Sequence, residues 1–92
     1  SFFNPILRAL EESGGKSRTA ELLRRVEQIM KGDLSQVDYE PHASQPHEPR
    51  WRKTAQWARY SMVREGLLTD DSARGTWEIA DTGRKYLAEG KA

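Results

Sequence analysis

The first third of the chain carries apolar side chains at the spacing of amphipathic helices. Ile6, Leu7 and Leu10 form one apolar stripe, preceded by Asn4-Pro5 and followed by Gly14-Gly15. Asn is a favoured N-cap, Pro suits the first helical position, and Gly ends helices. We therefore expect the first helix between these two pairs, with Asn4 as its N-cap.

A second apolar stripe begins after Ser17, the next candidate N-cap, and closes at Lys31-Gly32. Its members fall within about a third of the helical wheel, as in an amphipathic helix. They are Leu22, Leu23, Val26, Ile29 and Met30. A short turn that contains glycine joins the two helices, and we expect them to form a helical hairpin.

Residues 33–49 show neither a helical nor a strand periodicity. They contain three prolines and two histidines, and Asp33 can cap only a short turn through Val37. We therefore expect a loop that is long for so small a domain, and long loops are often functional or mobile.

The segment from about Pro49 to Glu65 predicts a third helix, ended by Gly66, that has two unlike faces. The apolar face comprises Trp51, Ala55, Ala58 and Met62. The opposite face comprises Lys53, Trp57, Tyr60 and Arg64, with Arg50 beside them. Five basic residues and no acidic ones fall between positions 50 and 64. One side of this helix can pack into a core, while the other offers cations and aromatic rings, as a helix that binds nucleic acid would.

The last part of the chain predicts a β-hairpin and a fourth helix. Residues 67–69 are expected to form one strand, residues 70–75 have turn chemistry, and residues 76–79 alternate as in a half-buried strand with Trp77 on its inner face. Asp81 or Thr82 is the candidate N-cap of the final helix.

The predicted fold is mainly α with a β-hairpin. Three helices, two strands and a C-terminal helix make a winged helix-turn-helix, with residues 1–92 as a single DNA-binding domain. In this architecture the third helix enters the major groove of DNA, and the hairpin, or wing, lies along the adjacent backbone or minor groove.

Composition limits the class of protein. The chain has 92 residues and no cysteine, which excludes disulfides and thiolate metal sites. No apolar run approaches the ~20 residues that span a bilayer, and no signal peptide is visible. Since the chain begins with a serine almost directly before a helix signal, we expect a domain cut from a longer, cytoplasmic protein.

Charge is segregated along the sequence. The formal net charge is only +1, which by itself argues against a strong non-specific nucleic-acid binder. Residues 33–48 hold four acidic residues and no Lys or Arg, whereas residues 50–64 show the opposite bias. A basic helix within a nearly neutral domain can still bind phosphates.

Several motifs together resemble the Mrr-type N-terminal winged-helix domain. They are Ile6–Leu10 followed by Gly14-Gly15, Pro49-Arg50-Trp51, Trp57-Ala58, Gly66-Leu67-Leu68, Arg74–Ile79 and Thr82-Gly83-Arg84. The resemblance implies a module that recognises double-stranded DNA, commonly fused to a nuclease domain in restriction systems directed at modified DNA. Similar winged helices in methyladenine-dependent restriction enzymes read N6-methyladenine, so a methylated base is a candidate ligand. The wing is less basic than expected for this family, because it carries Asp70 and Asp71, and Arg74 is its one basic residue.

The candidate DNA-binding residues divide by the contact that each side chain can make. We expect the major-groove contacts to come from Lys53, Thr54, Trp57, Tyr60 and Arg64. Phosphate contacts are expected from Arg50, Arg52 and Arg59, and a minor-groove contact is expected from Arg74. Trp57 can offer apolar surface to a methyl group, as apolar side chains do to the thymine methyl. In the alternative interpretation, Trp57 packs under residues 33–48, the cations form a solvated face, and Arg74 is a plain turn residue.

No catalytic set is visible, and we expect no enzyme activity within this chain. There is no phosphate-binding Gly-rich loop, no nuclease-like acidic cluster and no ordered triad. His42 and His47 lie near acidic residues, but their spacing matches no metal-ligand motif, so no metal or other cofactor is expected. The alternatives to a DNA reader are a protein-interaction or dimerisation module and a repressor-type transcription regulator, which would require a dimer.

Overall fold

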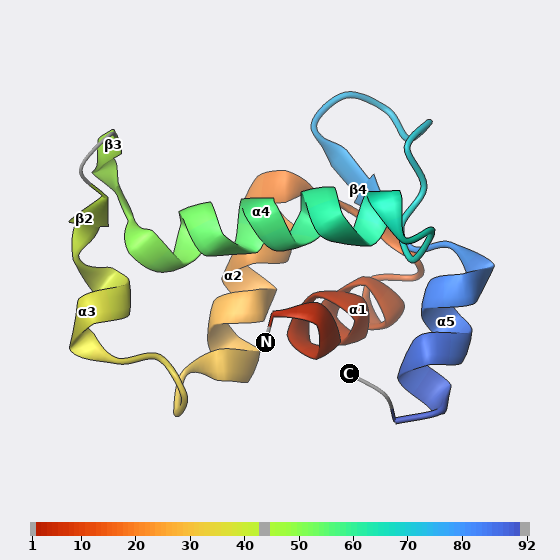
Figure 1. Ribbon diagram of the computed structural model, residues 1–92, viewed down its shortest axis with the longest axis horizontal. Coiled ribbons are helices and arrows are strands. Elements are labelled where there is room, and N and C mark those ends of the chain that lie inside the picture. Colours follow the sequence, from red (N-terminus) through yellow and green to blue (C-terminus); the bar gives the residue numbers. More distant parts are fainter. Residues whose placement is uncertain (1, 43–44, 91–92) are drawn as a thin grey trace.

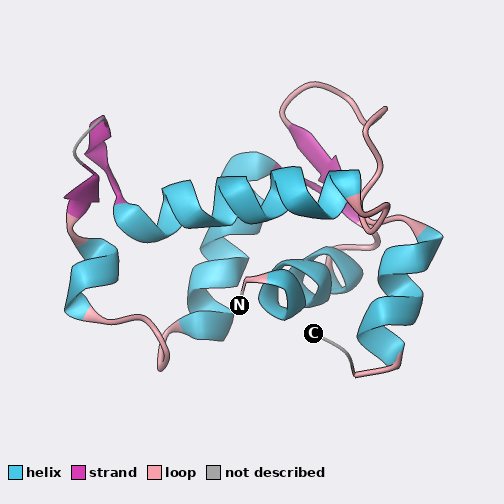
Figure 2. Cartoon of the chain, in the orientation of Figure 1, coloured by secondary structure: helices cyan, strands magenta, loops and turns pink. Residues whose placement is uncertain are grey.

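Five helices and two small two-stranded sheets make up the described part of the chain (Figures 1 and 2). The computed structural model describes residues 2–42 and 45–90, but not the side chains of residues 42–47. The elements are α1 (Phe3–Glu12), β1 (Lys16–Arg18), α2 (Thr19–Met30), α3 (Gln36–Tyr39), β2 (Pro41–His42), β3 (Gln45–Pro49), α4 (Arg50–Arg64), β4 (Thr76–Glu78) and α5 (Asp81–Ala88). No described helix has the length and apolar character needed to cross a membrane.

The core lies between α1, α2 and the inner face of α4. The predicted apolar stripes of α1 and α2 supply most of it, and α4 runs across both helices along the long axis of the molecule (Figure 1). The buried side chains are Ile6, Leu7, Ala9, Leu10, Leu22, Leu23, Val26, Met30, Trp51, Ala55, Met62, Leu67, Leu68, Trp77 and Ile79. The helical periodicity of the sequence therefore locates the core correctly.

The sheet of β1 and β4, which we call the wing sheet, differs from the predicted hairpin. Strand β4 pairs antiparallel with β1, with Ser17 opposite Trp77, and the predicted strand at residues 67–69 contributes one bridge, from Leu68 to Ile79. The prediction that Ser17 caps the second helix is therefore wrong, because this residue lies in β1. A strand of three residues, Lys16–Arg18, has too short a pattern to reveal itself by alternation.

The connection between α2 and α4 is structured, so the prediction of a loop without regular structure over residues 33–49 is wrong. Ser35, not Asp33, caps α3, in a capping box with Asp38. The short strands β2 and β3 then pair with each other, and the Arg50 amide donates to the Glu40 carbonyl at 2.8 Å. The fold is therefore mainly helical with two small antiparallel sheets and is compatible with a winged helix, although α3, β2 and β3 stand where a helix-turn-helix has a short turn.

Tyr39 holds this connection against α2. Its phenol donates a hydrogen bond to the Glu27 carboxylate. Removal from water raises the pKa of the Tyr39 phenol, and the hydrogen bond to Glu27 and the charges of Glu27 and Asp38 raise it further. The neutral phenol is thus the form that ties α3 to α2.

The N-caps of two helices lie one or two residues before their predicted positions. Helix α1 begins at Phe3, so Asn4 lies in its first turn and is not its N-cap. Helix α5 begins at Asp81 after Ala80 in the N-cap position, so neither Asp81 nor Thr82 is the cap. Helix ends depend on local backbone geometry that residue preference alone does not fix.

Candidate nucleic-acid interface

Helix α4 turns one side into the core and the other to solvent. Trp51 is 2% exposed, whereas Trp57 and Tyr60 are 63% and 57% exposed. The interpretation in which Trp57 packs under residues 33–48 is therefore wrong for this structure. An exposed pair of large aromatic side chains on one helix is the kind of surface that marks an interaction site.

Trp57, Tyr60 and Arg64 form a continuous row, which we call the outer row of α4. The Trp57 and Tyr60 ring centroids are 6.2 Å apart with an interplanar angle of 80°, and the Arg64 guanidinium carbon lies 5.8 Å from the Tyr60 centroid. Edge-to-face packing and a cation over a ring are both favourable contacts, so they limit the freedom of these exposed side chains.

The first turn of α4 extends this surface with cations. Arg50 is exposed and Lys53 is half-buried, while the Thr54 hydroxyl donates to the Arg50 carbonyl at 3.3 Å. This turn contains no acidic residue and no side-chain cap. Cations at the positive end of a helix dipole are unfavourable in the free protein, and a bound anion would relieve that repulsion.

Arg52 and Arg59, which the sequence predicts to touch phosphates, each pack on a tryptophan of their own chain. The Arg52 guanidinium carbon lies 5.7 Å from the Trp51 ring, and that of Arg59 lies 5.5 Å from the Trp77 ring. The contact of Arg59 with Trp77 holds α4 against β4. The Arg59 Nε is buried without a hydrogen-bond partner among the described residues.

Arg74 lies exposed at the tip of the wing, next to Gly75 with φ of +77°. The Gly75 carbonyl accepts hydrogen bonds from the Thr19 amide at 2.9 Å and from the Thr19 hydroxyl at 3.0 Å. The wing tip is therefore fixed against the start of α2, next to Arg18. The sequence did not reveal this neighbour, because 56 positions separate Thr19 from Gly75.

No group of three or more potential metal-ligating side chains gathers among the described residues. The candidate pair His42 and His47 lies outside the described side chains. The site is thus characterised by cations and aromatic rings.

The sequence model of one protein family, the Mrr N-terminal domain, matches residues 1–89. The chain belongs to the Mrr N-terminal domain family. No curated protein and no solved structure matches the chain significantly. This Mrr N-terminal domain is accordingly a restriction-system domain, and the resemblance inferred from its motifs is confirmed.

Proposed function

We propose that this Mrr N-terminal domain binds double-stranded DNA with α4 in the major groove. The observation that carries the proposal is the outer row of α4, in which Trp57, Tyr60 and Arg64 lie side by side on the solvent face. Arg50 and Lys53 continue the basic surface toward the start of the helix. A cationic helix with exposed rings suits phosphates at its edges and base edges at its centre.

The wing sheet supports a winged-helix mode of docking. The contact between Arg59 and Trp77 places β4 beside α4, so that the wing can follow the DNA backbone next to the groove that α4 occupies. Arg74 at the wing tip is then a candidate for the minor groove, where negative potential attracts arginine.

We further propose that the outer row reads a methylated base, with N6-methyladenine as the first candidate. Since the rings of Trp57 and Tyr60 stand at 80°, they cannot both stack flat on successive bases. Two perpendicular rings instead form an apolar corner that can receive a methyl group. Burial of one such group is worth ~0.8 kcal/mol, which corresponds to roughly a fourfold preference.

DNA cleavage is proposed to belong to a nuclease domain elsewhere in the parent chain. The surface described here consists of cations and aromatic rings, which bind and position DNA. A nuclease would need groups that activate water or hold a metal, and those are the chemistry of a separate domain.

A duplex titration tests the proposal. Binding of the 92-residue chain is measured on duplexes with and without N6-methyladenine, at about 50 mM and about 200 mM salt. If the domain contacts about four phosphates, affinity should fall about 100-fold between these salt concentrations. Lack of duplex binding at the lower salt would overturn the DNA-binding proposal, and equal affinity for both duplexes would overturn only the methyl-reading part.

A protein-interaction function is the second candidate, favoured by a different surface. Val37 and Tyr39 of α3 are 58% and 42% exposed, and the net charge of the chain is only +1. Gel filtration and duplex titration of the wild type and of Val37→Ser, which changes this surface and leaves the outer row of α4 intact, separate the two functions. If the wild type self-associates, Val37→Ser disrupts the association and neither protein binds duplex DNA, the protein-interaction function replaces the DNA-binding one.

A further inference from the structure

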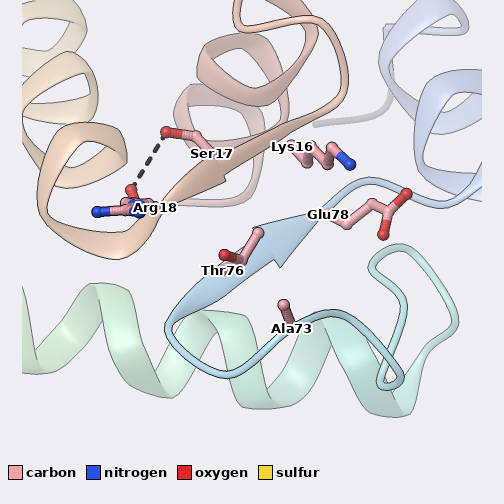
Figure 3. A pocket seen from close by; sticks show the side chains of 6 residues that line it. All are labelled: Lys16, Ser17, Arg18, Ala73, Thr76 and Glu78. Carbon is pink, nitrogen blue, oxygen red and sulfur yellow. Dashed lines mark hydrogen bonds between the residues drawn. The ribbon is translucent and has the colours of Figure 1, made fainter.

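A basic pocket lies on the face of the wing sheet that points away from α4 (Figure 3). Side chains alternate across a strand, so Lys16 and Arg18 of β1 lie on the face opposite to the buried Trp77. We infer that Lys16 and Arg18 form a second contact with the DNA backbone, which binds phosphate on the far side of the wing. The inference rests on the proposed binding of duplex DNA by α4.

The size and shape of the pocket suit a small anionic group. Its volume is about 260 Å³, and it is lined by Lys16, Ser17, Arg18, Ala73, Thr76 and Glu78. Pockets for small organic ligands usually enclose about 300–1,000 Å³, so this one falls just below that range. It is also open to solvent, as a surface that receives one phosphodiester of a long polymer has to be.

The pocket carries a net positive charge. Two cations line it, Lys16 and Arg18, whereas Glu78, opposite Lys16 in the sheet register, is the one carboxylate of its lining. Neither Lys16 nor Arg18 forms an ion pair with a described residue. The guanidinium and ammonium groups at the pocket are therefore available to an anion.

The fixed wing tip gives the pocket its shape before any ligand binds. The two hydrogen bonds from Thr19 to the Gly75 carbonyl hold the tip, whose Ala73 and Thr76 line the pocket, beside Arg18 at the end of β1. A pocket that has its shape before binding loses less conformational entropy when it binds its ligand.

The position of the pocket predicts which phosphates it meets. Trp77 faces Arg59 of α4 from the inner side of the sheet, so the wing separates the pocket from α4. A wing placed along the minor groove would therefore present Lys16 and Arg18 to the backbone beyond that groove, while α4 occupies the major groove. The acidic residues Asp70 and Asp71 are not part of the pocket lining.

The test compares salt dependence among variants of equal charge. Lys16→Ala/Arg18→Ala should make the plot of log affinity against log salt shallower by about 1 to 2, since each lost phosphate contact removes about 0.9. The control is Arg8→Ala/Lys85→Ala, which removes the same charge from exposed positions on α1 and α5. The control should leave the slope within about 0.5 of the wild type.

Glu78→Gln provides a test of opposite sign. Loss of this carboxylate should tighten duplex binding, which a merely structural role of Glu78 in the sheet would not do. Preference for the methylated duplex should stay unchanged in all three variants, because phosphate contacts carry no direct sequence information. Thermal unfolding confirms that each variant is folded.

The outcomes distinguish the two proposals. If the wild type binds duplex DNA and Lys16→Ala/Arg18→Ala behaves like the Arg8→Ala/Lys85→Ala control, the phosphate pocket is overturned and the role of α4 stands. If the wild type does not bind duplex DNA at all, both proposals are overturned. A shallower slope for the β1 variant alone, with tighter binding by Glu78→Gln, establishes the pocket.

Discussion

Two tryptophans six positions apart on α4 occupy opposite environments. Trp51 is 2% exposed in the core, whereas Trp57 is 63% exposed in the outer row. The helical wheel separates them correctly, because burial on one side of a helix follows a period of 3.6 residues. The packing of Arg52 and Arg59 on Trp51 and Trp77 could not be predicted in this way, since a cation over a ring depends on the tertiary position of both groups.

The two tryptophans should respond differently to truncation. Trp57→Ala should change the free energy of unfolding by no more than about 0.5 kcal/mol, as is usual for an exposed position. It should also remove the preference for the methylated duplex. Urea unfolding and duplex titration measure the two effects.

Trp51→Ala is the matched control at a buried position. Truncation of a core tryptophan should lower the free energy of unfolding by about 3 to 5 kcal/mol. If Trp57→Ala destabilises the domain as much as Trp51→Ala, the outer row is structural and the proposed role in base reading is wrong.

Gly83 is a residue at which packing overrides helix preference. It lies within α5, and a Cβ added there would meet the Leu67 carbonyl oxygen and lie 2.8 Å from the Ile79 side chain. Gly83→Ala should therefore destabilise the domain by about 1 to 3 kcal/mol, although Ala is favoured over Gly by about 1 kcal/mol within a helix. Thermal unfolding tests this, and a rise in melting temperature would contradict it.

At the scale of elements, long amphipathic segments were predictable and short pieces were not. Helices α1, α2 and α4 lie where the apolar stripes place them, since each stripe repeats over several turns. Strand β1 and helix α3 have three and four residues, and long-range pairing with β4 or a capping box decides their structure. The first of these omissions matters for the proposed phosphate contact, because β1 supplies Lys16 and Arg18.

The start of α4 should show a conflict between stability and binding. Arg50 stands at the positive end of the helix dipole, in a first turn without acidic residues. Arg50→Glu should raise the free energy of unfolding by about 0.3 to 1 kcal/mol and weaken DNA binding. Chemical unfolding and a duplex titration measure the pair of effects.

A control at the other end of the protein separates this effect from a change in overall charge. Lys85→Glu alters the net charge equally on exposed α5, near the C-terminal end of that helix. It should weaken α5 slightly, because a cation is favoured there, and leave duplex affinity nearly unchanged. If the two variants weaken binding equally, the Arg50 effect is one of net charge alone.

At the scale of the whole molecule, charge placement matters more than charge total. The net charge is +1, yet α4 carries five cations without an acidic residue, and Lys16 and Arg18 line the wing pocket. The segregation on α4 is visible in the sequence. The gathering at the wing is not, because it depends on the pairing of β1 with β4 and on the bonds of Thr19 to Gly75.

Whether α4 turns its outer row toward DNA can be measured most directly through the three tryptophan indole N–H signals in an NMR titration with duplex DNA. Trp57 is exposed on α4, and Trp51 and Trp77 are buried. The Trp57 indole signal should shift progressively as duplex is added, while that of Trp51 stays near its free position. A stationary Trp57 signal under conditions in which the protein binds the duplex would contradict the central claim.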